Sequence, residues 1–319
     1  IAKYPLFEYA PYETALAGKM VDIVQSAHLD ILHVHYAIPH ASAALVAKQI
    51  LAQQGITIPV VTTLHGTDIT LVGREMTYEH VVSWSINQSD AVTAVSEDLR
   101  KQTYEHFKIN RDIDVIPNFI DFGRFNKKPR EHFKQMIAPN GEKIIIHTSN
   151  FRKVKRIEDV IAVFAQIIKE IPAKLLLIGD GPERSHIEKV SREFNTCDWV
   201  TFLGKQEAIE EILSIGDLFI LPSESESFGL AALEAMACEV PVISSNAGGI
   251  PEVNIHGVTG YLSNVGDVND MAQNAITLLK DPQLLAKFRK NALQQAHKFD
   301  LAEILLQYEA IYNRVITTN

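Results

Sequence analysis

Two glutamates in residues 217–253 have the type and spacing to bind a phosphorylated ligand. Glu226 and Glu234 are eight positions apart, which is little more than two turns of an α-helix. We therefore expect the two carboxylates to lie on one face and to flank a bound phosphate. A single glutamate at a helix end is more often a solvated charge, so neither residue alone supports this hypothesis.

The sequence around the two glutamates predicts the elements that would position them. Residues 217–221 form an apolar run closed by a proline, as at the end of a buried strand. Residues 223–227 are polar and predict a loop, and residues 231–237 have the composition of a helix. A helix that begins after a strand presents free N–H groups and a positive dipole end, which suit a phosphate. We expect the next strand at 241–243 and another loop at 247–252.

A basic segment, S-N-F-R-K-V-K-R, occupies residues 149–156, directly after an expected strand at 143–148. A run of charges is usually a solvated face. At a strand end, however, fixed cations would stabilise the charge that builds on a leaving phosphate. Two further loops follow strands, G-D-G-P at 179–182 and G-K-Q at 204–206, and each is weak evidence by itself.

A second set of candidates follows the expected strand at residues 59–63. His65 and Asp68 lie in the segment H-G-T-D, just after Thr63. His65 is equally compatible with a turn histidine and with a ligand contact. Asp68 is equally compatible with contacting an acceptor and with capping a local turn.

Strands and helices alternate along the chain, which predicts an α/β protein with parallel sheets. Ligands of such sheets bind at the carboxyl ends of the strands. Residues 121–142 are charged and punctuated by prolines, as in a linker between two domains. The other expected strands are 30–35, 91–95, 114–118, 173–178 and 200–203, and the expected helices include 12–27, 42–53, 79–87, 267–279, 282–298 and 301–315.

Composition excludes several classes of protein. The 319 residues are 46% hydrophobic, enough for two cores, and the net charge of −9 argues against a nucleic-acid surface. Cys197 and Cys238 lie far apart without metal or disulfide spacing, which favours a reducing compartment, and hence the cytoplasm. No apolar run approaches the roughly 18 residues that a membrane span needs. The phosphate region has no Asp-x-Asp pair, so we expect no metal there.

The motifs together resemble the retaining glycosyltransferases of family 4, which have the GT-B fold and use nucleotide-sugar donors. The likeness rests on E-S-F-G-L-A-A-L-E at 226–234, followed by P-V-I and G-G-I-P-E. It implies two Rossmann-like, doubly wound domains facing a central cleft. Residues 1–120 would form the acceptor-side domain, on which a last helix at 301–319 packs, and residues 121–300 the nucleotide-sugar domain. Because no strand with a Gly-rich loop precedes the first helix, we expect that an N-terminal piece is missing.

The resemblance implies roles for residues on the donor side. Glu226 would accept hydrogen bonds from the transferred sugar and Glu234 from the ribose. The family places an arginine five residues before Lys155, but Asn150 stands there, so Arg152 or Arg156 would supply that charge. Other donor contacts would come from Gly179, the backbone around Gln206, and the N–H groups of Phe228, Gly229 and Leu230.

The resemblance further implies that His65, Glu226 and Lys155 are the catalytic residues. The leaving phosphate would help to deprotonate the acceptor on the front face, without a cofactor or an essential divalent metal. Within the family, D-I-L-H-V-H-Y-A-I-P-H-A and S-N-F-R-K-V-K-R resemble the subgroup that transfers N-acetylglucosamine from UDP-N-acetylglucosamine to L-malate in bacillithiol biosynthesis. Desolvating a dicarboxylate requires donors and a cation. Tyr36, Thr63, Asn118 and Arg74 are the candidates.

Several alternatives remain open from the sequence. Another family 4 enzyme would use a sugar, inositol or lipid acceptor, and a lipid acceptor should bring an apolar or basic face that we do not find. A non-catalytic nucleotide-sugar sensor would keep the donor residues with less reason to keep His65 and Glu226. The sequence is compatible with a homo-oligomer and does not fix the oligomeric state.

Overall fold

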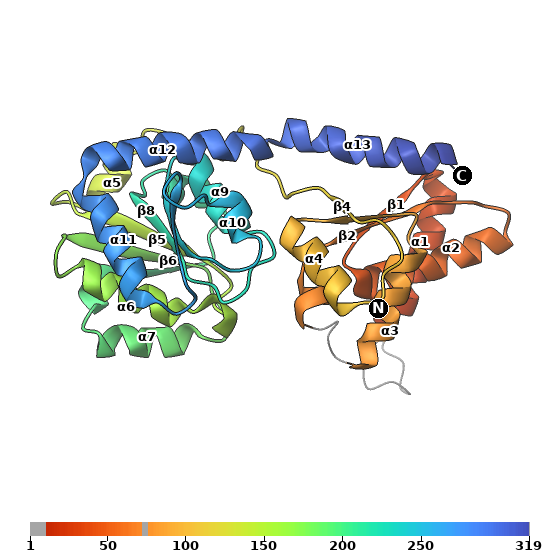
Figure 1. Cartoon of the computed structure of the whole chain (residues 1–319), viewed down its shortest axis with the longest axis horizontal. Coiled ribbons are helices and arrows are strands. Elements are labelled where there is room, and N and C mark those ends of the chain that lie inside the picture. The colour runs from red at the N-terminus through yellow and green to blue at the C-terminus, as the bar shows by residue number, and fades with distance from the viewer. Residues whose placement is uncertain (1–10, 72–75, 319) are drawn as a thin grey trace. The chain divides into compact units, whose positions relative to one another are not determined.

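The computed structural model describes residues 11–71 and 76–318 (Figure 1). The chain divides into two compact units, residues 1–117 with 304–319, and residues 118–303. The boundaries expected from the sequence were 120/121 and 300/301. None of the described helices is long and apolar enough to cross a membrane.

The first unit has a four-stranded parallel sheet in the order β1-β2-β3-β4. Neighbouring residues of β2 face opposite sides of this sheet, because side chains alternate along a strand. Val60 packs with α1 and α2, whereas Val61 packs with Ile304, Ile311 and Val315 of the C-terminal helix. The elements are α1 (Tyr12–Ala27), β1 (Leu32–His35), α2 (Ser42–Gln53), β2 (Val60–Leu64), α3 (Met76–Gln88), β3 (Ala91–Ala94), α4 (Glu97–His106), β4 (Asp114–Val115) and α13 (Leu301–Thr318).

The second unit has a six-stranded parallel sheet in the order β10-β9-β8-β5-β6-β7. The chain adds strands outward from β5 on one side and then returns to add β8, β9 and β10 on the other. The strand order therefore reverses between β5 and β8, which is where ligands bind in doubly wound sheets. The strands are β5 (Lys143–Thr148), β6 (Ala173–Ile178), β7 (Val200–Gly204), β8 (Leu218–Leu221), β9 (Val242–Ser245) and β10 (Gly260–Ser263).

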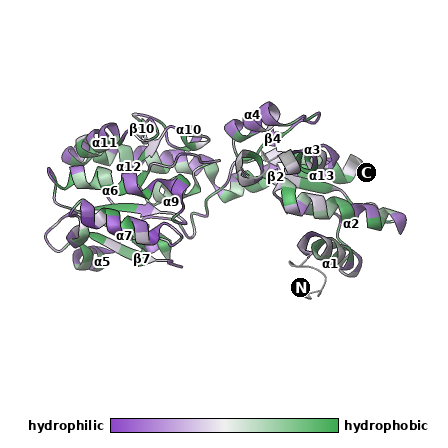
Figure 2. Cartoon of the chain, turned by 90° about the horizontal axis from the view of Figure 1, so that it is seen from below, coloured by the Kyte–Doolittle hydropathy of each residue, from purple (hydrophilic) through white to green (hydrophobic). Residues whose placement is uncertain are grey.

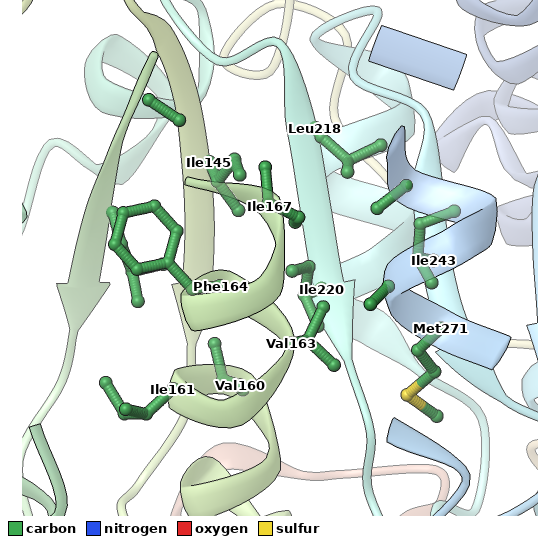
Figure 3. Packing of buried hydrophobic residues seen from close by; sticks show 14 of the residues in the cluster. Ile145, Val160, Ile161, Val163, Phe164, Ile167, Leu218, Ile220, Ile243 and Met271 are labelled. Carbon is green, nitrogen blue, oxygen red and sulfur yellow. The ribbon is translucent and has the colours of Figure 1, made fainter. Parts of the chain in front are cut away.

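Right-handed crossovers in the two directions place helices on both faces of this sheet. On one face, α6 and α11 pack over Ile145, Leu218, Ile220 and Ile243, as Figure 3 shows. The helices are α5 (Glu131–Ile137), α6 (Ile157–Ile167), α7 (Arg184–Glu193), α8 (Ile209–Leu213), α9 (Leu230–Ala237), α10 (Ile250–Val253), α11 (Val268–Lys280) and α12 (Pro282–Ala296).

Helices rich in charged residues occur in both units. Helix α4 of the first unit and helix α7 of the second are largely purple in Figure 2.

The predicted α/β class with parallel sheets is confirmed, and two local predictions are wrong. The expected linker at 121–142 contains helix α5, and the expected loop at 247–252 leads into the short helix α10. Both helices are brief, at 7 and 4 residues. Elements this short carry too few turns for an apolar period to show in the sequence.

Candidate active site

The loops that follow β5 and β8 lie at the reversal of strand order in the second unit. The backbone N–H of Glu224 donates to the carbonyl of Val154 at 2.8 Å, which joins the two loops. Lys155 Nζ donates to Glu226 Oε1, and Ser223 Oγ donates to the same oxygen at 3.1 Å. The side chains of Lys155 and Glu226 are only 20% and 14% exposed. The structure therefore brings two of the expected catalytic residues into direct contact.

Two glycines allow neighbouring loops to approach these residues closely. Gly248 has a φ of +56°, and a Cβ there would lie 1.9 Å from the carbonyl oxygen of Glu226. Gly179 has a φ of +117°, and a Cβ there would lie 1.8 Å from the carbonyl oxygen of Ser149. Any other residue would need a rare backbone conformation and would also collide with backbone. The loops after β6 and β9 thus support the two loops of the site.

The first turn of α9 offers unbonded backbone donors. Across the described part of the chain, the N–H groups of Phe228, Gly229 and Leu230 have no hydrogen-bond acceptor. Phe228 is buried and packs edge-on against Phe299, with ring centroids 5.5 Å apart. Free N–H groups at a helix start favour an anion. Free backbone donors therefore lie at the residues expected to bind the diphosphate, and that binding stays a prediction.

The predicted loop at 223–227 is confirmed, and the helical spacing used to put Glu226 and Glu234 on one face does not apply. α9 begins at Leu230, so Glu226 lies in the loop before it and only Glu234 is helical. Burial raises the pKa of Glu234 to about 7, Arg124 opposes this shift, and Glu210 adds to it. Arg124 itself is bonded to Glu210, with 3.2 Å between Nε and Oε2.

The structure distinguishes the arginines that were candidates to replace the family's arginine. Arg156 Nε donates to Asp159 Oδ2 at 2.6 Å, so its charge is already paired. Arg152 is exposed and has no ion-pair partner among the described residues. Asn150 is exposed as well. Of the two arginines, Arg152 is the one available to a ligand.

His147, which the sequence reasoning passed over, lies buried near the end of β5. Its Nδ1 is 2.8 Å from the carbonyl oxygen of Ile220, and its Nε2 is 2.9 Å from Ser149 Oγ. Burial lowers the pKa of His147 to about 4, with the hydrogen bond to Ile220 opposing the shift and the charge of Lys155 adding to it. A neutral histidine therefore joins β5 to β8 beneath the site. The only sequence signal was a polar residue within an isoleucine-rich strand.

In the first unit, His65 lies just past the carboxyl end of β2 and contacts a histidine that the sequence reasoning also missed. His65 Nε2 is 2.8 Å from Nδ1 of His35, the last residue of β1. Burial, with His35 and His33 nearby, lowers the pKa of His65 to about 4. The ring of Tyr36 is 5.0 Å from that of His65.

Asp68 connects the loops that follow β1 and β2. Its carboxylate accepts from the N–H of Ala37 at 2.7 Å and from the N–H of Gly66 at 3.1 Å. Burial raises the pKa of Asp68, and these backbone donors oppose the shift. Asp68 does bond within its own turn, and it also reaches across to the neighbouring loop.

Thr63 belongs to a buried network rather than to the surface. Its Oγ1 lies 2.7 Å from His33 Nε2 and 2.7 Å from Thr93 Oγ1. His33 Nδ1 lies 2.7 Å from the hydroxyl of Tyr312 on α13. Burial, with His35 nearby, lowers the pKa of His33 to about 4.

The remaining candidates are more scattered. Asn118 is half-buried at the start of the second unit, and Arg74 lies outside the described residues. Gln206 is exposed and donates to the carbonyl of Leu203 at 2.6 Å, and the N–H of Gly179 donates to the carbonyl of Gly204 at 2.8 Å. Among the described residues, no three His, Cys, Asp or Glu side chains are grouped to hold a metal ion.

Two family models match the chain. The model described as Glycosyl transferases group 1 matches residues 128–295. The model described as Glycosyltransferase Family 4 matches residues 1–124. Together they span nearly the whole chain, with one model falling mostly on each unit.

Known proteins with similar sequences or structures agree with the family models. The chain is 48% identical over 318 residues to N-acetyl-alpha-D-glucosaminyl L-malate synthase of Bacillus anthracis, covering 99% of this chain and 83% of that protein. Sucrose-phosphate synthase of Thermosynechococcus elongatus superposes with a TM-score of 0.80 at 25% identity, covering 99% of this chain and 82% of that one. HepE of Anabaena, in complex with UDP and glucose, superposes with a TM-score of 0.82 at 24% identity, covering 94% and 82%.

Proposed function

The chain belongs to the family 4 glycosyltransferases, which have the GT-B fold, and on this premise we propose that it transfers N-acetylglucosamine from UDP-N-acetylglucosamine to L-malate. The observation that carries the proposal is the 48% identity, over 99% of the chain, to a relative named for that product. The reaction would be the first step of bacillithiol biosynthesis and would retain the configuration of the sugar.

The donor half of the proposal assigns the second unit to UDP-N-acetylglucosamine. The diphosphate binds the free N–H groups of Phe228, Gly229 and Leu230, with Lys155 and Arg152 as cations. Glu234 accepts from the ribose hydroxyls, and Glu226 accepts from a hydroxyl of the sugar. Cleavage of the sugar–phosphate bond builds charge on the leaving diphosphate, and prearranged donors stabilise that charge without reorganising.

The acceptor half assigns L-malate to the first unit. Its hydroxyl attacks the anomeric carbon on the face that the diphosphate leaves, and a diphosphate oxygen takes the hydroxyl proton. Tyr36 supplies a polar contact, with Thr63 supporting it from within the sheet. Asn118, at the start of the second unit, and Arg74, outside the described residues, are kept as the other candidates. The proposal includes no metal, because lysine, arginine and backbone N–H groups already meet the charge of the diphosphate.

The test supplies UDP-N-acetylglucosamine with L-malate, D-malate, lactate or inositol and identifies the products by mass spectrometry. We expect a product with L-malate, formed equally well in excess EDTA, with the α-configuration in its proton NMR spectrum. A product with inositol but not with L-malate would contradict the acceptor and leave the glycosyltransferase family intact. Release of free N-acetylglucosamine alone would contradict transfer to any of the four acceptors.

A further inference from the structure

The contact between His35 and His65 constrains what His65 can do chemically. His35 Nδ1 and His65 Nε2 are 2.8 Å apart, and the two rings lie 5.0 Å apart at 47°. The contact uses one ring nitrogen of each residue. Among the described residues, no side chain or backbone group is bonded to Nδ1 of His65. That nitrogen is therefore the one left free to bond a substrate.

Two neutral imidazoles that share a hydrogen bond hold one proton between them. The pKa of His65 is lowered to about 4 by burial, with His35 and His33 beside it. The pKa of His35 is also lowered by burial, with His40 nearby. Both rings are therefore neutral near pH 7, and each carries a single N–H. The bond forms only if one ring donates and the other accepts.

The direction of the bond follows from the preferences of the two rings. A neutral histidine side chain intrinsically favours the form protonated at Nε2. If His65 Nε2 donates to His35 Nδ1, both rings keep that form, and Nε2–H of His35 is left without a partner among the described residues, on a side chain that is partly open to solvent. If His35 donates instead, both rings must adopt the less favoured form. The first arrangement is lower in energy for both residues.

Neighbouring contacts hold the two histidines in register. In the β1–β2 ladder the Cα partner of His35 is Thr63, two residues before His65. Asp68 connects the loops after these strands through the N–H groups of Ala37 and Gly66. His40 Nδ1 lies 2.6 Å from the carbonyl oxygen of His35. The histidine pair is thus built into the end of the sheet.

We propose that His35 is a positioning residue that holds His65 with Nε2 protonated and Nδ1 bare, so that His65 accepts a hydrogen bond from a substrate hydroxyl. A bare nitrogen repels a carboxylate, because both groups are acceptors. His65 therefore contacts a hydroxyl of the sugar or of the acceptor, and not a carboxylate of the acceptor. This inference rests on the proposed function for the identity of the substrates, and not for the state of the histidine pair.

The first test reads the proton positions directly. In protein labelled with ¹⁵N-histidine, the His65 signals, assigned by their loss in His65→Asn, should show a protonated Nε2 and a bare Nδ1 at pH 7.5. The signals of His35 should show the same form. A protonated Nδ1 on His65 would overturn the proposal whatever reaction the protein catalyses. This measurement also stands if the protein makes no N-acetylglucosaminyl malate, so the two proposals can fail separately.

The second test replaces His35 with residues of graded similarity. The amide oxygen of Asn stands where Nδ1 of histidine stood and can accept from His65, so His35→Asn should keep most of the turnover. His35→Leu removes the acceptor, and its kcat for transfer should fall about five- to tenfold, as for one lost hydrogen bond. The affinity for UDP alone should be unchanged in both. The exposed His80 provides the matched control, His80→Asn.

Turnover equal to that of the wild type in both the Leu and the Asn variant would overturn the positioning role. So would equal losses in both, because a merely structural histidine gives no reason for Asn to rescue. If His35→Leu does not fold, the NMR spectrum of the wild type and the turnover of His35→Asn still decide the matter.

Discussion

The two units of this chain both bring polar groups to the ends of their parallel strands, but the groups differ in charge. In the second unit the groups are charged, with Lys155 bonded to Glu226 and Arg152 exposed nearby in sequence. In the first unit they are neutral imidazoles and hydroxyls, as in the pair of His35 and His65. The difference matches the groups that these residues are proposed to contact, since a diphosphate carries charge and the hydroxyls of the sugar and of L-malate do not, although the carboxylates of L-malate do.

The comparison implies different sensitivities. Charge-assisted hydrogen bonds are about twice as strong as neutral ones and weaken with salt where they are exposed. Neutral networks depend on geometry and on each member keeping its partner. Substitutions in the second unit should therefore change activity most, and substitutions in the first unit should divide their effects between activity and folding stability.

The largest expected effect is that of Lys155→Ala. The rate of transfer should fall on the order of a hundredfold, as when a group that stabilises transition-state charge is removed. The melting temperature should hardly change, because the lysine is not part of the core. Lys153→Ala is the matched control, since Lys153 is exposed in the same turn. A large loss of stability with normal specific activity would make Lys155 a structural residue and remove the contrast between the units.

The next effect concerns Glu226→Gln. Turnover should fall by the equivalent of about 1.5–3 kcal/mol, the range for a hydrogen bond to a charged group. UDP without a sugar should bind at least as tightly as to the wild type, because Lys155 is no longer neutralised by a carboxylate. The control is Glu224→Gln, an exposed glutamate of the same loop. Weaker UDP binding in Glu226→Gln would show that the ion pair with Lys155 organises the phosphate site rather than competing with it.

How much of the structure the sequence predicted depends on how far apart along the chain the interacting residues are. The bounds of α1 and α2 were predicted correctly, because a long apolar period and clear ends are local properties. The pair of His35 and His65 was not predicted, since the residues are 30 positions apart and meet only through the register of β1 on β2. Glu226 was correctly placed in the loop at 223–227, but its spacing from Glu234 was interpreted with helical geometry that only Glu234 has.

The titration of Glu234 offers a subtler test of the charged unit. Because burial raises the pKa of Glu234 to about 7, its carboxyl is protonated at pH 6 and ionised at pH 8. An ionised carboxylate is the better acceptor for ribose hydroxyls, so affinity for UDP should rise between these values. Dividing the affinity of the wild type by that of Glu234→Gln cancels the ionisation of UDP itself. The ratio should increase with pH to about tenfold, the scale of one charge-assisted bond. A ratio that does not change with pH would remove Glu234 from the ribose site.

The smallest effect should come from Tyr312→Phe in the neutral network of the first unit. The substitution removes the hydroxyl that lies 2.7 Å from His33 Nδ1, while the other nitrogen of His33 keeps Thr63. We expect a loss of about 0.5–1.5 kcal/mol in the free energy of unfolding, the net value of a neutral hydrogen bond. Turnover should change less than in Lys155→Ala or Glu226→Gln, because Tyr312 contacts His33 and not the residues at the strand ends. Tyr78→Phe, at an exposed tyrosine, controls for loss of a phenolic hydroxyl. Chemical denaturation and steady-state kinetics on the same samples check both halves. A drop in turnover as large as that of Lys155→Ala, with no loss of stability, would mean that the neutral network takes part in the chemistry itself.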